Sequence, residues 1–313
     1  MATAVSTPAS SQPARFRWGW GVTWQKRWLP YLLVGPVVLV VGIGVFYPVI
    51  YVVNLSLHAY SPFLGSTMRF VGVANYLRLI ADAEFWHSLQ VSAIWVAGSV
   101  IPQFLLGLGL ALLLNERFRA RGVIRAIVLL PWVVSGVVTG IIWLWLFDGT
   151  IGVLNDLLMK AGLTPTPIPW SVQPATTYLM LFVANAWRGS PFFAIMLLAA
   201  LQSINPDVYE AAMIDGASRW QRFRYVTLPL ILNAVIISTL LRAIWTFNYV
   251  DLIWTMTQGG PVNTTRTLAL DIFKVAYQDG DFGFAATLAV ALCVILLAFS
   301  GAYWQLNRFI SRD

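Results

Sequence analysis

The chain has 313 residues, of which 58% are hydrophobic and only 11% are charged. A soluble domain carries about a quarter charged residues, so this composition excludes an ordinary soluble protein and favours one surrounded by membrane lipid. The net charge of +7 could suggest nucleic-acid binding. Because Lys and Arg also mark the cytoplasmic side of membrane proteins, we favour that interpretation and expect no nucleic-acid partner. The single cysteine, Cys293, excludes disulfides within the chain.

The first residues, 1–13, are rich in Ala, Ser, Thr and Pro, which is typical of a disordered segment. We therefore predict a disordered cytoplasmic tail over residues 1–28. The segment lacks the short apolar core and cleavage site of a signal peptide. The apolar sequence from Leu29 onward is then retained as a membrane span, and residues 29–313 form one transmembrane domain with its core at about 88–306.

Six apolar runs follow along the chain, at residues 29–53, 88–114, 126–147, 176–201, 230–254 and 284–306. Each is long enough to cross a hydrocarbon core of about 30 Å at about 1.5 Å per residue. The sequence therefore predicts an all-α, polytopic membrane protein with six transmembrane helices. In the third run, Gly136 and Gly140 form a pair of small residues that would let helices approach closely, although chance in a Gly-rich chain explains the pair equally well.

The distribution of basic residues predicts the orientation in the membrane. With the N-terminus in the cytoplasm, 13 of the 20 Lys and Arg residues lie in inside segments and 5 lie in outside loops. The remaining two, Arg188 and Arg242, lie within predicted spans. Because basic residues favour the cytoplasmic side, we expect both termini to be cytoplasmic.

A polar segment at residues 202–229 separates the fourth and fifth runs. Asn205 is a good N-cap, Pro206 suits the first helical position, and Asp207 in the first turn favours the helix dipole. Gly216 is a natural stop after the helix. These signals predict a short helix over residues 206–215, which could be a docking helix or an interfacial helix that only links two spans.

Three ionisable residues fall within the predicted spans, namely Arg188, Arg242 and Asp251. Such residues are rare in membranes and are usually functional. Around them lie aromatic and polar residues: Asn185, Trp187, Trp245, Thr246, Phe247, Asn248 and Tyr249. Sugars bind flat aromatic faces and planar hydrogen-bonding groups, so this neighbourhood predicts a sugar site. The alternative is a structural ion pair among the three charges, with the Trp residues as interfacial anchors.

The sequence shows no sign of a catalytic machinery of its own. It has no Gly-x-x-x-x-Gly-Lys-Ser/Thr phosphate loop, and His58 and His87 stand apart without metal-ligand spacing. We therefore expect no catalytic residue, no metal and no cofactor on this chain, and a chain that is not an enzyme. Chemical energy must then come from a partner.

The polar segment resembles the signature loop of ABC importer permeases. The matching residues are Glu210-Ala211-Ala212, Gly216, Val226 and Leu228-Pro229, with Val226 where the family usually has Ile. In that family the loop is a coupling helix that inserts into the ATP-binding subunit. The resemblance therefore implies that coupling to the ATPase depends on Asp207, Glu210, Ala211, Ala212, Asp215 and Gly216, with Glu210 contacting a basic residue of that subunit.

Further stretches resemble the carbohydrate-type subfamily, in particular the first of two permeases in maltose- and trehalose-type systems. They are residues 86–89, 130–132, 145–154, 185–187 and 259–261. The resemblance implies the type I importer permease fold in a bacterial plasma membrane. It also implies three kinds of partner, which are a second related permease, two ATP-binding subunits that hold ATP and Mg, and an extracytoplasmic sugar-binding protein.

The same resemblance places sugar contacts at particular positions, which are Asn185, Arg188, Gly189, Arg242, Trp245, Thr246 and Tyr249. Arg188 and Arg242 depart from the maltose-type permease, where both positions are uncharged. The implied cargo is a disaccharide such as trehalose or a maltose-like oligosaccharide, and glycerol phosphate is the alternative.

Two other classes of protein are possible on the sequence. An ion-coupled secondary transporter would work alone and would show inverted repeats and broken helices, neither of which the sequence indicates. A membrane scaffold would give no reason for charged residues within spans.

Overall fold

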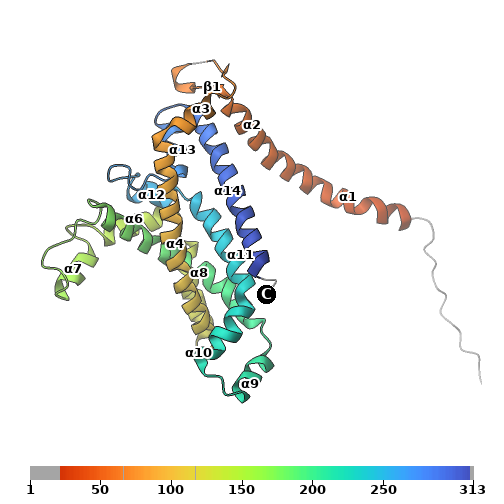
Figure 1. Cartoon of the computed structure of the whole chain (residues 1–313), viewed down its shortest axis with the longest axis vertical. Coiled ribbons are helices and arrows are strands. Elements are labelled where there is room, and N and C mark those ends of the chain that lie inside the picture. Colours follow the sequence, from red (N-terminus) through yellow and green to blue (C-terminus); the bar gives the residue numbers. More distant parts are fainter. Residues whose placement is uncertain (1–21, 66, 117, 311–313) are drawn as a thin grey trace, which may run out of the picture. The chain divides into compact units, whose positions relative to one another are not determined.

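The computed structural model describes residues 22–65, 67–116 and 118–310 (Figure 1). Residues 1–21 of the predicted tail lie outside this description. Helix α1 (Val22–Val41) begins within the segment expected to be tail, ahead of the predicted start at Leu29. By its contacts the chain divides into two units, Met1–Tyr51 and Val52–Asp313.

The described residues of the first unit form a single run of helix. After α1 it continues through η1 (Gly42–Phe46), a π-helical turn, into α2 (Tyr47–Ser56). The stretch Trp28–Ser56 has a mean hydropathy of 2.4 over its most apolar window, and none of that window is buried inside the protein. A helix with apolar side chains on all its faces is typical of a membrane span.

The second unit begins within α2 at Val52, and a short hairpin follows the end of that helix. Strand β1 (His58–Ala59) pairs antiparallel with β2 (Arg69–Phe70), and η2 (Pro62–Leu64) lies between them. The amphipathic helix α3 (Ala74–Ala81) follows. Next comes α4 (Ala83–Asn115), which is capped by Asp82, whose Oδ1 accepts the Glu84 N–H at 3.0 Å.

Helices α4 and α8 (Pro174–Gln202) lie side by side and form the centre of the second unit (Figure 1). Their largest fully buried side chains include Trp95, Leu181 and Phe193. The two helices approach closely at Gly107, where an added Cβ would lie only 2.3 Å from Phe193 Cβ.

The third apolar run is broken, so the prediction of one continuous helix over residues 126–147 is wrong. It forms α5 (Arg121–Val133) and α6 (Gly136–Leu146), which meet at a bend of 96°. Ser135 is extended and caps α6 by accepting the Val138 N–H at 3.3 Å. The structure thus contains a broken helix pair that the sequence did not indicate.

The helix that contains the fifth apolar run begins and ends earlier in the sequence than the predicted run over residues 230–254. It begins at Arg219 and continues through α10 (Arg219–Arg222), η3 (Phe223–Thr227) and α11 (Leu228–Phe247). It ends where Asn248 Nδ2 donates to the Ile244 carbonyl at 2.9 Å. Asp251 consequently lies outside the span, as the first residue of the separate helix α12 (Asp251–Met256).

The remaining helices of the second unit are α7 (Val153–Lys160), α9 (Pro206–Ile214), α13 (Leu268–Tyr277) and α14 (Phe282–Ile310). Within the described residues, five helices are long and apolar enough to cross a membrane, or six if the bent pair α5–α6 is one span. The predicted all-α, polytopic architecture is confirmed, with the two-residue strands of the hairpin as the exception.

Gly136 and Gly140 do permit a close approach between segments. An added Cβ at Gly136 would lie 2.3 Å from the Tyr249 hydroxyl, and one at Gly140 would lie 2.8 Å from Thr255. Because neither glycine has a side chain, α6 can lie directly against α12 and the residues that precede it.

Candidate functional site

The short helix predicted in the polar segment is present as α9. The Asn205 side chain accepts the Asp207 N–H at 3.0 Å, and Pro206 is the first helical residue. The helix ends before Asp215, and Gly216 follows with a φ of 76°, a conformation that glycine adopts without strain. Sequence and structure therefore agree on both ends of this helix.

A second capped turn follows that the sequence analysis missed. Ser218 accepts the Gln221 N–H at 3.3 Å, and Gln221 Oε1 accepts the Ser218 N–H at 2.8 Å, which forms a capping box. The Ser-x-x-Gln spacing was the signal that could have located it. Because this turn runs without interruption into α11, the α9 segment is joined directly to a membrane span.

One side of α9 is open. The predicted coupling residues Asp207, Glu210 and Asp215 are exposed, as are Ala211 and Gly216, and Ala212 is half-buried. Next to them Ile214 is 87% exposed and Met213 is 50% exposed. Exposed apolar residues beside carboxylates are the combination expected of a protein-binding surface.

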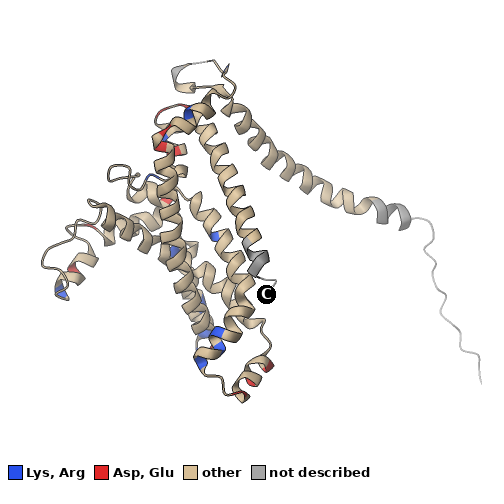
Figure 2. Ribbon diagram, viewed as in Figure 1, with Lys and Arg blue, Asp and Glu red and all other residues tan. Residues whose placement is uncertain are grey.

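The opposite side of α9 packs against the start of the fifth span. The Tyr209 hydroxyl lies 3.1 Å from Thr227 Oγ1. Figure 2 shows acidic residues on α9 and basic residues grouped around α10 at the same end of the bundle. The acidic surface of α9 is therefore distinct from the basic surface beside it.

The predicted sugar-binding residues separate into a buried set and an accessible set. Asn185, Gly189, Arg242 and Thr246 are buried within this chain. The Asn185 amide is fully buried and has no hydrogen-bond partner among the described residues.

The accessible set consists of Arg188, Trp245 and Tyr249. Arg188 Nε donates to the Val134 carbonyl at 3.1 Å, and its guanidinium carbon lies 4.9 Å from the centre of the Tyr249 ring. Trp245 is 47% exposed and packs edge-on against Phe192. Arg188 thus links the α5–α6 break, α8 and the segment after α11.

Gln103 is a member of the buried set that the sequence analysis missed. Its amide receives a hydrogen bond from Arg242 Nε and donates one to the Asn185 carbonyl at 3.1 Å. The signal in the sequence was an amide in the middle of a long apolar run. Amide side chains inside membrane helices usually bond to a neighbouring helix.

The structural ion pair considered from the sequence does not form among the described residues. Arg188 and Arg242 make no ion pair with Asp251, and the four ion pairs present involve Arg78, Lys160 and Arg266. Arg242 is instead bonded to a neutral amide. Neither Arg188 on α8 nor Arg242 on α11 therefore has a carboxylate partner among the described residues.

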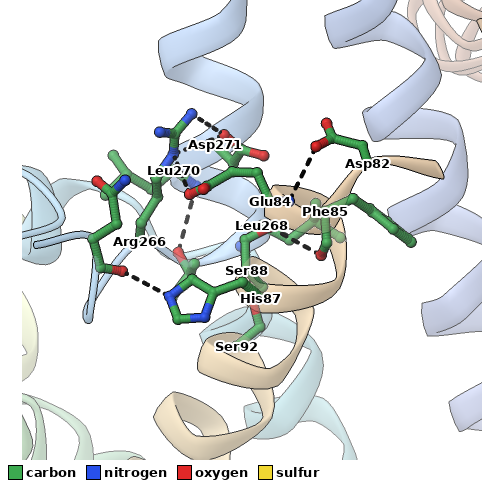
Figure 3. A network of polar contacts seen from close by, with 12 residues as sticks. Asp82, Glu84, Phe85, His87, Ser88, Ser92, Arg266, Leu268, Leu270 and Asp271 are labelled. Atoms are coloured by element: carbon green, nitrogen blue, oxygen red, sulfur yellow. Dashed lines mark hydrogen bonds and ion pairs between the residues drawn. The ribbon is translucent and has the colours of Figure 1, made fainter. Parts of the chain in front are cut away.

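A polar network ties the start of α4 to the loop before α13, at the end of the unit opposite α9 (Figure 3). Arg266 Nε bonds Asp271 Oδ1 at 2.8 Å and lies 3.5 Å from Glu84 Oε1. Ser92 Oγ accepts the Leu268 N–H at 2.8 Å. Burial raises the pKa of Asp271, and the Arg266 charge opposes that rise.

His87, which the sequence gave no metal-ligand spacing, has its Nε2 3.3 Å from the Asn263 carbonyl oxygen. No group of three or more potential metal ligands occurs in the part of the chain that the structure describes. The network of Figure 3 holds the loop before α13, which contains Gly259-Gly260-Pro261, against the start of α4. Its role is therefore structural.

Comparisons with known proteins agree with this arrangement. The chain is 37% identical over 283 residues to a probable ABC transporter permease protein of Brucella suis, covering 90% of this chain and 98% of the relative. It is 37% identical over 281 residues to the trehalose/maltose transport system permease protein MalF of Thermococcus litoralis, covering 90% and 94%.

A solved structure of a bacterial alginate ABC transporter, in complex with an alginate pentasaccharide-bound periplasmic protein, has a similar fold. The TM-score is 0.78 at 23% identity, covering 92% of this chain and 97% of the other. Residues 103–309 match the family described as binding-protein-dependent transport system inner membrane component. Because this match spans well over half of the sequence, the chain belongs to that family of ABC importer permeases.

Proposed function

We propose that this chain is the membrane-spanning permease subunit of an ATP-driven, binding-protein-dependent importer of a carbohydrate. The observation that carries the proposal is α9, a capped helix with an exposed acidic and apolar face, which is followed closely by the helix that carries Trp245 and leads to Tyr249. A docking surface and cargo-binding side chains thus lie at opposite ends of one stretch of the chain. The name of the Thermococcus relative supports a sugar as cargo.

In this proposal α9 docks into an ATP-binding subunit. Glu210 pairs with a basic residue there, the small side chains of Ala211 and Ala212 let the partner approach closely, and Ile214 and Met213 bury their exposed apolar surface. This chain hydrolyses nothing itself, and ATP and Mg are held by the partner. A second, related permease docks a second ATP-binding subunit, and the two permeases enclose the path for the sugar.

The proposed cargo is a disaccharide such as trehalose or a maltose-like oligosaccharide. Trp245 and Tyr249 offer aromatic faces, and the Arg188 guanidinium offers planar donors. The Asn185 amide and the Tyr249 hydroxyl have no partner in the described structure. Buried polar groups normally find partners, so the hydroxyls of a sugar are suitable ligands for them.

Glycerol phosphate is the second candidate cargo. It is favoured by one observation, which is that Arg188 and Arg242 have no carboxylate partner among the described residues. A guanidinium group binds phosphate through paired hydrogen bonds. Competition between the two cargoes for uptake would separate these candidates.

The proposed location is a bacterial plasma membrane with both termini in the cytoplasm. This orientation is supported by the basic residues around α10, which lie at the same end as α9 (Figure 2). A substrate-binding protein then delivers sugar at the opposite end. ATP binding draws the two docking helices together, and rigid-body motion of the bundles exposes the sugar site to alternate sides.

The test is reconstitution of the complex in liposomes with the second permease, the ATP-binding subunit and the binding protein. Labelled trehalose or maltose should accumulate only with ATP. Glu210→Arg should leave the protein in the membrane but abolish sugar-stimulated ATP hydrolysis, whereas Asp156→Arg, a charge reversal at an exposed site outside α9, should not. Retained coupling in Glu210→Arg would disprove the docking role.

The same experiment addresses the two alternative classes. An ion-coupled transporter, which the broken pair α5–α6 would suit, would move sugar without the ATP-binding subunit. A scaffold would move no sugar under any condition. Uptake that requires the ATP-binding subunit excludes both.

A further inference from the structure

We infer that Gln103 and Arg242 form a clamp that transmits the motion of the α9 segment to the cargo-binding side chains. Gln103 is a positioning residue in this account, because it acts through Arg242 and touches no cargo. The inference rests on the proposed function, since a clamp of this kind has a role only in a permease that is driven through α9.

The clamp joins three helices at one level of the bundle. Arg242 on α11 donates from Nε to Gln103 Oε1 on α4, and Gln103 Nε2 donates to the Asn185 carbonyl on α8 at 3.1 Å. Gln103 is 0% exposed and Arg242 is 5% exposed. The two bonds therefore connect α11 to α4 and α8 away from water, where hydrogen bonds hold most strongly.

Gly189 makes this connection possible. An added Cβ at Gly189 would lie 2.3 Å from both Arg242 Nη2 and Gln103 Cδ. The two side chains therefore cross α8 directly over the glycine. Because the Arg242 and Gln103 side chains lie against the backbone of Gly189, Arg242 has little room to shift relative to α8 in this conformation.

The charge of Arg242 makes the connection hard to break. A guanidinium group inside a membrane span is costly unless it is bonded. The acceptor that the described structure offers to the Arg242 guanidinium is the amide of Gln103. Removal of that acceptor leaves the charge buried without a partner, so this part of α11 must move to satisfy it.

The clamp lies at a particular place on the fifth span. This helix runs from Arg219 to Phe247 over 29 residues and starts just after α9. Arg242 is about 35 Å along the helix from its start, at about 1.5 Å per residue. Trp245 follows three residues later, and Thr246 Oγ1 donates to the Arg242 carbonyl at 2.8 Å.

The helix therefore has a docking segment at one end and cargo-binding side chains at the other, with the clamp next to the cargo. When α9 is displaced, a helix held at Arg242 turns about that point together with α4 and α8. A helix released at Arg242 slides past α4 and α8. The cargo-binding side chains then no longer move together with the ATP-binding subunit. Loss of the clamp should thus uncouple ATP hydrolysis from transport rather than abolish either.

The test uses the complete complex in liposomes, with Gln103→Leu, Gln103→Glu and the control Thr239→Val. Thr239 lies on the same helix one turn before Arg242, and among the described residues its hydroxyl bonds only the Val235 carbonyl of its own helix. The measured quantity is the amount of sugar imported per ATP hydrolysed. Gln103→Leu should lower this ratio about tenfold, within the 5- to 150-fold range of typical coupling energies. Thr239→Val should keep the ratio. Gln103→Glu keeps the acceptor for Arg242 but loses the donor to the Asn185 carbonyl, so it should lower the ratio less than Gln103→Leu does.

A wild-type ratio in Gln103→Leu would overturn the clamp and leave the proposed function intact. A wild-type complex that imports no sugar with ATP would overturn the proposed function instead. If the complex with Gln103→Leu does not assemble, the complex with Gln103→Glu alone tests the clamp. Its ion pair with Arg242 strengthens the connection between α4 and α11, although the bond to the Asn185 carbonyl is lost. ATP hydrolysis in the absence of sugar should therefore fall several-fold, and unchanged sugar-free hydrolysis would overturn the inference.

Discussion

The close approach of α4 and α8 predicts that two glycines on one helix respond in opposite ways to substitution by alanine. At Gly107 an added Cβ would lie 2.3 Å from Phe193 Cβ, 2.8 Å from the Ser190 carbonyl oxygen and 3.1 Å from Ala194 N. Two of these atoms belong to the backbone and cannot rotate away. Gly109, two residues later, has no atom within 4 Å of the added Cβ.

The magnitudes follow from this geometry. Overpacking a well-packed contact costs about 1–3 kcal/mol, so Gly107→Ala should lower the free energy of unfolding by that amount as α4 is forced away from α8. Gly109→Ala should raise it by about 0.5–1 kcal/mol, because alanine loses less conformational freedom than glycine in a helix. The two variants should therefore differ by about 1.5–4 kcal/mol.

The measurement is equilibrium unfolding of the purified protein in detergent micelles, followed by far-ultraviolet circular dichroism. Wild type, Gly107→Ala and Gly109→Ala are compared under identical conditions. Equal stability of the two variants would refute the argument that α8 lies directly on Gly107. Because α8 carries Asn185 and Gly189, Gly107→Ala should also reduce sugar uptake.

Three further predictions concern the site and the loops. Trp245→Ala and Tyr249→Ala should each raise the sugar concentration for half-maximal uptake about two- to tenfold, equivalent to about 0.5–1.5 kcal/mol of aromatic contact; unchanged uptake kinetics in both would remove them from the cargo site. Gly189→Ala should lower the amount of assembled complex, since the added Cβ would lie 2.3 Å from both Arg242 Nη2 and Gln103 Cδ. A wild-type amount of complex would show that these two side chains move aside easily. Hydrogen bonds from Ile151 N–H, Thr150 N–H and the Thr150 hydroxyl lower the pKa of Asp148 below its ordinary value of 3.8. The Asp148 carboxylate therefore stabilises the fold above about pH 3.8, and this stabilisation is lost as the pH falls through the lowered pKa. Carboxyl-carbon NMR should give a titration midpoint below 3.8, and a midpoint at or above that value would contradict the turn geometry.

Features set by neighbouring residues could be predicted from the sequence. The ends of α9 depend on Asn205, Pro206 and Gly216, and each acts on backbone within a few residues of itself. The number and approximate position of the membrane-spanning segments follow from the length of the apolar runs. Local chemistry was sufficient in both cases because the physical interaction is itself local.

The break between α5 and α6 and the end of α11 were not predicted. Both lie inside runs that are apolar on average, where mean hydropathy does not locate the end of a helix. The break depends on the Ser135 cap and on Gly136 packing against Tyr249, a residue far away in the sequence. Such an end is stabilised by tertiary contacts, so composition alone cannot locate it.

The sequence by itself determined that this chain is embedded in a membrane and carries a capped helix between two spans, because hydropathy and capping act over short distances. Only the tertiary structure decided which of the polar residues in the spans are buried, and that Arg242 is bonded to Gln103, 139 positions away, rather than to Asp251. A hydrogen bond of that sequence separation arises from the packing of α4, α8 and α11 over Gly189. No local pattern in a sequence records such a contact.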